Sequence, residues 1–169
     1  NMALAEQAEP GILARARRVI VMGGAVDEPG NVRPTAEFNV YADPEAARVV
    51  ILSGAPLTLV PLDVTHRVVL DEVSMRAVAD TAEGRFAARA VKAGMGRSLR
   101  LAGSRRFYLH DPLAVGVAVD ASICTCERLW LDVETRGDLT AGQLVVDRRP
   151  VDDMSLRKGL PCDCAMSVD

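Results

Sequence analysis

Two clusters of polar side chains in this sequence have the residue types of a sugar and metal site. Asn31, Glu37 and Asn39 lie in one polar segment and supply a carboxylate and two amides, which together accept from and donate to hydroxyl groups. Far along the chain, His110 supplies a group that titrates near neutral pH, and Asp111 supplies a hard oxygen of the kind that Ca²⁺ binds. The pattern predicts a site for sugar hydroxyl groups beside a cation.

The first of these clusters lies between two segments that we expect to be neighbouring strands. Residues 18–23 (RVIVMG) and 57–62 (LTLVPL) are short apolar runs, which is typical of buried parallel strands. Between them, residues 24–42 are expected to form a long loop, and Asp43-Pro44 predicts the start of a helix. Such an order implies a right-handed crossover, with ligands bound beyond the carboxyl ends of the strands. The fold class predicted is α/β, an open, mostly parallel sheet with helices on both faces.

The remaining chain fits the same architecture. Residues 2–17 have helical spacing broken at Pro10-Gly11, and residues 67–101 are helix-like with breaks near residues 83–84 and 94–96. Asp111-Pro112 predicts a helix from residue 112 to about 119 with Asp111 as its N-cap. Further strands are expected within 129–137, 143–149 and 164–168.

Composition excludes several classes of protein. The chain has 169 residues, 49% hydrophobic and 25% charged, which suits one globular domain. The net charge is −3 and basic residues are interleaved with acidic ones, so no nucleic-acid partner is expected. No apolar run is long enough to span a membrane and no signal peptide is visible, so we expect no membrane partner and a cytoplasmic location.

Five segments of the chain, in order, resemble the inosine-uridine preferring nucleoside hydrolase family. They are MGGAV, GNVRPTAEFNVYADPEAA, PLTLVPLDVTH, FYLHDPLAVGVAVD and WLDVETRGDLTAGQLVVDRR. The most specific of them is GNxxPxAEFN followed by DPEAA, and the later HDP at a helix start agrees with it.

This resemblance implies calcium-dependent hydrolysis of the N-glycosidic bond of ribonucleosides to ribose and free base. It implies that Asn31, Glu37 and Asn39 bind ribose hydroxyls, that Met22 lies against the ribose, and that Asp111 ligates Ca²⁺. His110 would lie near the nucleobase as a candidate acid for the leaving group. The resemblance further suggests a role in purine and pyrimidine salvage and is compatible with a homo-oligomer.

One family feature is missing. The family begins with an aspartate-rich box, DxDxxxDD, which supplies most of the metal's carboxylates, whereas the first Asp of this chain is Asp27. We therefore interpret residues 1–169 as a single domain that is the carboxyl-terminal part of a nucleoside hydrolase, with the N-terminal strands missing. The alternative is a truncated, non-catalytic remnant, or a ribose-binding or interaction module.

Simpler structural roles compete with the proposed functional ones. Asp111 would serve as a plain N-cap, Glu37 and Asn39 would satisfy backbone groups of the loop, Met22 would fill the core, and Asp63 would cap the next helix. The four cysteines form two CxC pairs, for which buried thiols are favoured over a zinc site or disulfides. The sequence leaves the preferred nucleobase open.

Overall fold

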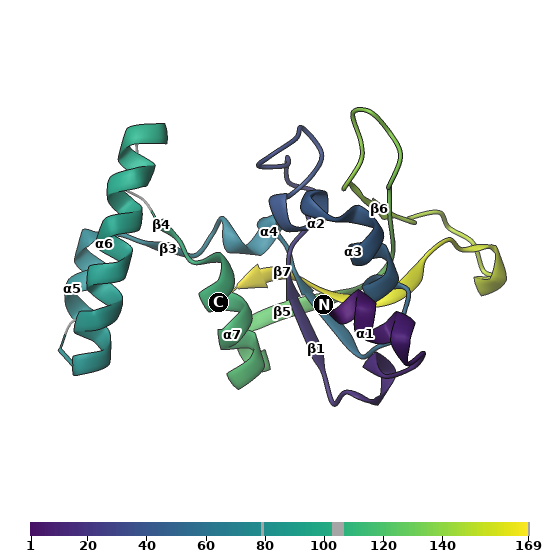
Figure 1. The fold of residues 1–169 in the computed structure, drawn as a ribbon, viewed down its shortest axis with the longest axis horizontal. Coiled ribbons are helices and arrows are strands. Elements are labelled where there is room, and N and C mark those ends of the chain that lie inside the picture. Colours follow the sequence, from purple (N-terminus) through teal and green to yellow (C-terminus); the bar gives the residue numbers. More distant parts are fainter. Residues whose placement is uncertain (79, 103–106, 169) are drawn as a thin grey trace.

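A five-stranded sheet forms the centre of the protein. The computed structural model describes residues 1–78, 80–102 and 107–168. Within them the strand order is β1-β2-β7-β5-β6, with bounds Val19–Met22, Leu57–Val60, Leu160–Val168, Cys124–Val133 and Leu144–Val146 respectively. Strand β1 is one edge of this sheet, and Figure 1 shows it beside α1.

The sheet is mixed, with four strands running the same way. β1 pairs with β2 in parallel, and β2 pairs with β7 in parallel. β5 runs antiparallel to both β7 and β6, so it alone opposes the common direction. The predicted α/β class with a mostly parallel sheet is confirmed, and the carboxyl ends of β1 and β2 lie together because Met22 is in register with Val60.

Helices cover both faces of the sheet, as predicted. On one face, α3 (Pro44–Ile51) packs Ile51 onto β-strand residues such as Leu59 and Leu131. On the other face, α7 (His110–Val119) packs Leu113 and Val117 against Val60 and Ala165. Burial of these aliphatic side chains supplies the apolar driving force that holds the layers together.

The other helices are short, except in one region. They are α1 (Met2–Ala8), α2 (Phe38–Ala42), α4 (Leu62–Thr65), α5 (Glu72–Val78) and α6 (Ala82–Ala102), with 3₁₀ turns at Leu13–Arg15, Ala121–Ile123 and Met154–Leu156. The helix expected over residues 2–17 is confined to α1 and the first of these turns, as expected from the break at Pro10-Gly11. Strand β7 begins four residues before the predicted start.

Helices α5 and α6 form a hairpin that stands apart from the sheet, linked to it through the antiparallel pair β3 (Val69–Leu70) and β4 (Phe107–Tyr108) (Figure 1). The break expected near residues 94–96 is wrong, since α6 runs through Gly94. A Cβ at Gly94 would lie 2.5 Å from the Phe107 ring, so this glycine permits close packing and does not end the helix.

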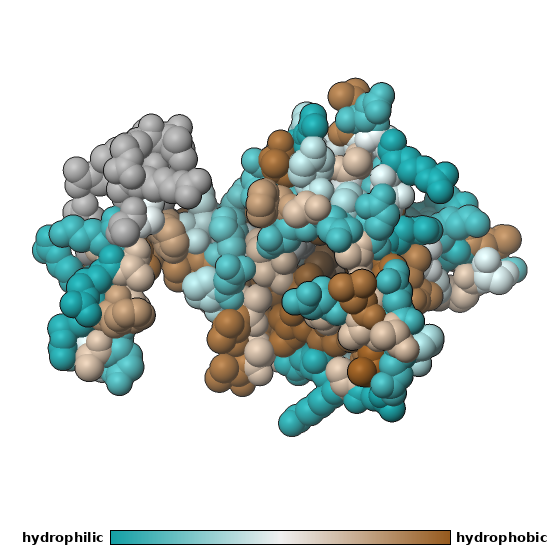
Figure 2. All heavy atoms as spheres, in the orientation of Figure 1, coloured by the Kyte–Doolittle hydropathy of each residue, from teal (hydrophilic) through white to brown (hydrophobic). Residues whose placement is uncertain are grey.

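The surface in Figure 2 is mostly hydrophilic and is interrupted by apolar areas over α7 and near α1. Val115 and Val119 of α7 and Leu4 of α1 are among the exposed apolar residues. None of the described helices has the length and apolar character needed to cross a membrane.

Candidate active site

Glu37 organises the loop that follows β1. Its backbone is extended and its side chain caps α2, accepting hydrogen bonds from the backbone N–H groups of Asn39 (2.9 Å) and Val40 (3.3 Å). The same carboxylate accepts from the N–H of Gly24 at 2.9 Å, although it lies 13 residues away. Glu37 is only 2% exposed. Its charge is therefore compensated inside the protein by three oriented N–H dipoles.

Asn39 joins this loop to the end of β1. Its side-chain amide donates to the backbone oxygen of Met22 at 3.2 Å and lies 3.3 Å from the Met22 sulfur. Asn31 contacts the first residue of α2, where its side-chain oxygen accepts from the N–H of Phe38 at 2.9 Å. The structure thus brings the four predicted sugar-binding residues to one helix N-terminus. It also shows that Glu37 and Asn39 satisfy backbone groups, as the simpler interpretation expected, and that Asn31 does so as well.

His110 is held by α4. Its Nδ1 lies 2.7 Å from the hydroxyl of Thr65, which is completely buried. Burial lowers the pKa of His110, and the charge of His66 lowers it further, whereas the carboxylates of Glu37 and Asp111 oppose the shift. Asn39 contacts Met22 at the end of β1, and Thr65, the partner of His110, follows the adjacent end of β2, so the two predicted clusters lie at the same end of the sheet.

Asp111 is not the N-cap of α7, so that part of the sequence interpretation is wrong. The helix begins at His110 because the N–H of Leu113 bonds to the carbonyl of Leu109, which takes the N-cap position. Asp111 lies in the first helical turn, is exposed, and accepts no hydrogen bond from the described residues. Its carboxylate is available to a ligand.

The described residues do not by themselves fit a calcium ion. They contain no group of three or more His, Cys, Asp or Glu side chains arranged to hold a metal. Calcium takes roughly six to eight oxygen ligands, and Asp111 contributes a single carboxylate. Further ligands would have to come from outside these residues.

Asp63 is a site residue that the sequence interpretation assigned incorrectly. It does not cap the following helix. It is 3% exposed and accepts from the backbone N–H groups of Val26 (2.8 Å), Asp27 (2.7 Å) and Glu28 (3.2 Å). Two buried carboxylates, Glu37 and Asp63, thus hold successive parts of the same loop. The signal available in the sequence was an Asp directly after an apolar strand, which indicates the sheet edge but not the partner.

His66 and Tyr108 were also missed. His66 follows α4 and Tyr108 lies in β4, and both rings surround His110. Ring centroids are 5.0 Å apart for His66 and Tyr108, 5.7 Å for His66 and His110, and 5.8 Å for Tyr108 and His110. The carboxylate of Glu28 lies 3.9 Å from Nδ1 of His66.

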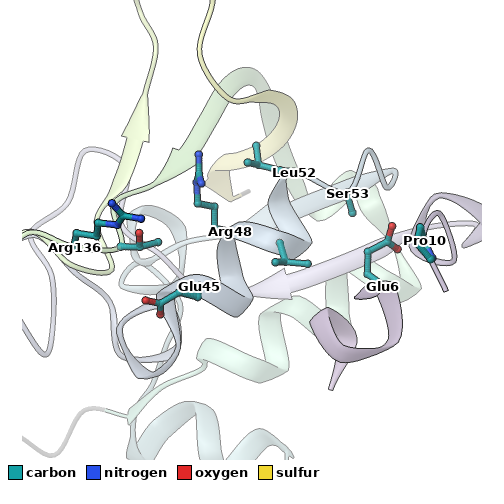
Figure 3. Close-up of a pocket in the computed structure, with 9 residues that line it drawn as sticks. Glu6, Pro10, Glu45, Arg48, Leu52, Ser53 and Arg136 are labelled. Atoms are coloured by element: carbon teal, nitrogen blue, oxygen red, sulfur yellow. The ribbon is translucent and has the colours of Figure 1, made fainter. Parts of the chain in front are cut away.

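Two cavities lie on the face that α3 covers. Figure 3 shows one of about 650 Å³, where Glu6 and Arg48 project from α1 and α3. Arg48 is bound to Asp132 at 2.6 and 3.0 Å, and Glu6 accepts from the N–H groups of Gly11 and Leu13. No predicted site residue lines this cavity. A second cavity, of about 290 Å³, is lined by Met22 and Asn39 and otherwise mainly by apolar residues of α1, α3 and the sheet.

Comparison with known proteins gives a consistent result. The model of the inosine-uridine preferring nucleoside hydrolase family matches residues 1–169. The chain is 37% identical over 155 residues to the inosine-uridine preferring nucleoside hydrolase of Crithidia fasciculata, covering 88% of this chain and 48% of that protein. It is 35% identical over 156 residues to the pyrimidine-specific ribonucleoside hydrolase RihA of Escherichia coli O9:H4, covering 87% and 48%.

Solved structures agree with the sequence relatives. The purine-preferring ribonucleoside hydrolase from Gardnerella vaginalis matches with a TM-score of 0.85 and 32% identity, covering 99% of this chain and 52% of that chain. The plant nucleoside hydrolase PpNRh1 matches with a TM-score of 0.86 and 27% identity, covering 99% and 54%. The chain thus spans about half the length of these relatives. By the match over its whole length, the chain belongs to the inosine-uridine preferring nucleoside hydrolase family.

Proposed function

We propose that residues 1–169 form a single domain that is the carboxyl-terminal part of a calcium-dependent nucleoside hydrolase. Together with a segment that carries the aspartate-rich box, it would hydrolyse the N-glycosidic bond of ribonucleosides to ribose and free base. The observation that carries this proposal is the meeting of Met22, Asn31, Glu37 and Asn39 around α2, within electrostatic reach of His110. Asp111 would be the metal ligand that this chain contributes.

Each residue would have a distinct role at the sugar. Asn31 and Asn39 retain amide atoms that can bind ribose hydroxyls, and Glu37 holds the loop that presents them. The side chain of Met22 would lie against the apolar face of the ribose. His110, held by Thr65, would donate a hydrogen bond or a proton to the departing base. The neighbouring carboxylates would balance the positive charge that develops on the ribose as the bond breaks.

Reconstitution tests this function. The chain would be mixed with the complementary half of the Crithidia fasciculata relative, and release of ribose from inosine and uridine would be measured with calcium and with a calcium chelator. We expect hydrolysis from the mixture in calcium, and none from either part alone. A folded complex of the two parts that hydrolyses no ribonucleoside would contradict the proposal.

The second candidate is a ribose-binding or interaction module without hydrolase activity. What favours it is that the described residues provide no three-ligand metal cluster. Calorimetry with ribose and inosine, with and without calcium, would detect binding by the 169-residue chain. Turnover of a ribonucleoside by this chain alone would exclude the module.

We further propose that the protein acts in purine and pyrimidine salvage in the cytoplasm and assembles as a homo-oligomer. Cys162 and Cys164 lie buried in the core, where a reducing compartment would keep them as thiols. Light scattering of the purified chain would give its assembly state.

A further inference from the structure

We propose that His66 and Tyr108, together with His110, form the surface that recognises the nucleobase. This inference rests on the proposed function and extends it, because it assigns base recognition to two residues outside the sugar loop. The ligand is a planar nucleobase, which presents aromatic faces to stacking partners and ring nitrogens and carbonyl oxygens at its edge.

The backbone holds these three rings together. Residues 65–70 run antiparallel to residues 107–110: Val69 is in register with Tyr108, and the N–H of Leu109 donates to the carbonyl of Val68 at 2.9 Å. The contact between the Thr65 hydroxyl and Nδ1 of His110 joins the far ends of these two segments. The rings therefore come from the residue after α4, from β4 and from α7, but they belong to one short, hydrogen-bonded structure.

The geometry of the rings suits an aromatic ligand. Their planes are tilted by 47° (His66 and Tyr108), 61° (His66 and His110) and 35° (Tyr108 and His110), so both ring faces and ring edges are presented. Aromatic groups attract one another in offset-stacked and edge-to-face arrangements of this kind. The side chain of His66 is 33% exposed and Tyr108 is 38% exposed, so both can be reached from solvent.

Two polar atoms of this surface, the Tyr108 hydroxyl and Nε2 of His66, are available to a ligand. Among the described residues, neither the Tyr108 hydroxyl nor a ring nitrogen of His66 makes a hydrogen bond, and the nearest charge, on Glu28, is 3.9 Å from Nδ1 of His66. The N–H of Glu28 is held by Asp63. Glu28 therefore faces Nδ1 and leaves Nε2 of His66 for the edge of the base.

The position of the rings agrees with the geometry of a nucleoside. Glu28, in the same loop as Asn31 and Glu37, lies 3.9 Å from Nδ1 of His66, so the ring cluster lies beside the sugar loop, where a base joined to the sugar would lie. His110 would then be near the glycosidic nitrogen, while His66 and Tyr108 would contact the face and outer edge of the base.

Nuclear magnetic resonance tests the assignment because the chain has only two histidines. The imidazole signals of His66 and His110, assigned with His66→Gln, and the methyl signal of Met22, assigned with Met22→Leu, would be followed in the 169-residue chain at fixed pH. Hypoxanthine, uracil and ribose would be added in separate titrations. We expect the bases to shift the His66 signal and ribose to shift the Met22 signal.

The readouts separate the two proposals. A His66 signal that neither base moves, with Met22 moved by ribose, overturns base recognition and leaves the sugar site standing. A Met22 signal that ribose does not move counts against the proposed function itself. If no signal moves with any of the three compounds, both proposals are overturned.

Two variants measure how much His66 and Tyr108 contribute to the affinity for the base. His66→Gln removes a ring and should raise the Kd of the bound base about tenfold, and Tyr108→Phe keeps the ring but removes the hydroxyl and should raise it about threefold. Tyr41→Phe is the matched control, because it removes a hydroxyl that binds Arg33 elsewhere and should leave the Kd unchanged. A base Kd that is the same in all three variants and the wild type overturns the inference.

Discussion

Glu37 and Asp63 are buried carboxylates whose charge is balanced by backbone N–H groups rather than by cations. Glu37→Gln would place amide hydrogens against the N–H groups of Gly24, Asn39 and Val40. We expect a loss of about 1–3 kcal/mol in the free energy of unfolding, measured in urea. The control is Glu45→Gln on the exposed first turn of α3, expected to change it by under ~0.5 kcal/mol. Equal effects in both would contradict the role given to Glu37.

Asp63 acts on a different stretch of the same loop. Asp63→Asn retains the shape but removes the charge that binds the N–H groups of residues 26–28. We expect faster hydrogen exchange of these amides by roughly tenfold or more, since their protection would lose about 1–3 kcal/mol. Asp138→Asn, at an exposed turn, should not alter their exchange. Unchanged protection in Asp63→Asn would exclude Asp63 as the anchor.

The residue types of the candidate site and the end of the sheet at which they lie could be predicted from the sequence, but their hydrogen-bond partners could not. Asn31, Glu37 and Asn39 were predicted as one cluster because they occur within nine residues of each other, and they do meet. The partner of Asp63 lies 35 to 37 residues away in a loop without periodicity, so no local pattern indicates it. The N-cap role predicted for Asp111 was wrong. The Asp-Pro pattern is local, whereas the hydrogen bond from the N–H of Leu109 to the carbonyl of Val68 depends on tertiary structure.

The loop after β1 packs closely against β6 at Gly24. Gly24 has φ of +80°, and a Cβ there would lie 2.2 Å from Cδ1 of Leu144 in β6. Gly54 has φ of +73° with nothing within 4 Å of such a Cβ. Both Gly→Ala variants incur the left-handed backbone cost, about 1–2 kcal/mol, but Gly24→Ala also overpacks and should lose a further ~1–3 kcal/mol in thermal or urea unfolding. Equal losses of stability in Gly24→Ala and Gly54→Ala would show that the Leu144 side chain moves to accommodate the added Cβ at no cost.

Helix α3 is fixed to β5 by the pair of Arg48 and Asp132. Hydrogen bonds from the Arg48 guanidinium hold the pKa of Asp132 below its ordinary value. Because the folded pKa is lowered, the stabilisation is present above the unfolded pKa of about 4 and is lost as pH falls through the folded pKa. The stability difference between wild type and Arg48→Gln, under ~1 kcal/mol for this half-exposed pair, should be constant above pH ~5 and shrink toward pH ~2.

The control for this pH dependence is Arg17→Gln, which removes an exposed arginine without an ion pair among the described residues. Its stability difference from wild type should not change over the same pH range. A difference for Arg48→Gln that stays constant down to pH ~2 would contradict the proposed linkage.

Element types were predictable where the local signals were strong. The Asp43-Pro44 helix start is confirmed, with Asp43 accepting from the N–H of Ala46 at 2.9 Å. The helix break predicted near Gly94 is wrong. A glycine in a helical segment can either end the helix or allow another residue to pack closely, and only the position of Phe107 shows that Gly94 does the second.

For the whole molecule, strand order was beyond prediction from the sequence. The last strand, β7, inserts between β2 and β5, and its Cys162 and Cys164 join Leu57 and Leu59 of the neighbouring β2 in the same core cluster. This insertion leaves β1 at the edge of the sheet. The N–H groups of Val19 and Gly23 bond to the carbonyls of Pro56, just before β2, and of Val60, so by strand alternation the N–H of Ile20 points away from the sheet.

Under the proposed function, this edge is where a strand of the complementary half would pair. Ile20→Pro removes the outward N–H while sparing the bonds to β2, a position at which an edge strand tolerates proline. Ile20→Ala is the matched control, because it removes the same packing of Ile20 on the α7 side but keeps the N–H. We expect both variants to fold with reduced stability and only Ile20→Pro to bind the complementary half of the Crithidia fasciculata relative at least about tenfold more weakly in calorimetry. Equal binding by the two variants would mean that the halves join through their helices, and that the edge of β1 stays open in the assembled enzyme.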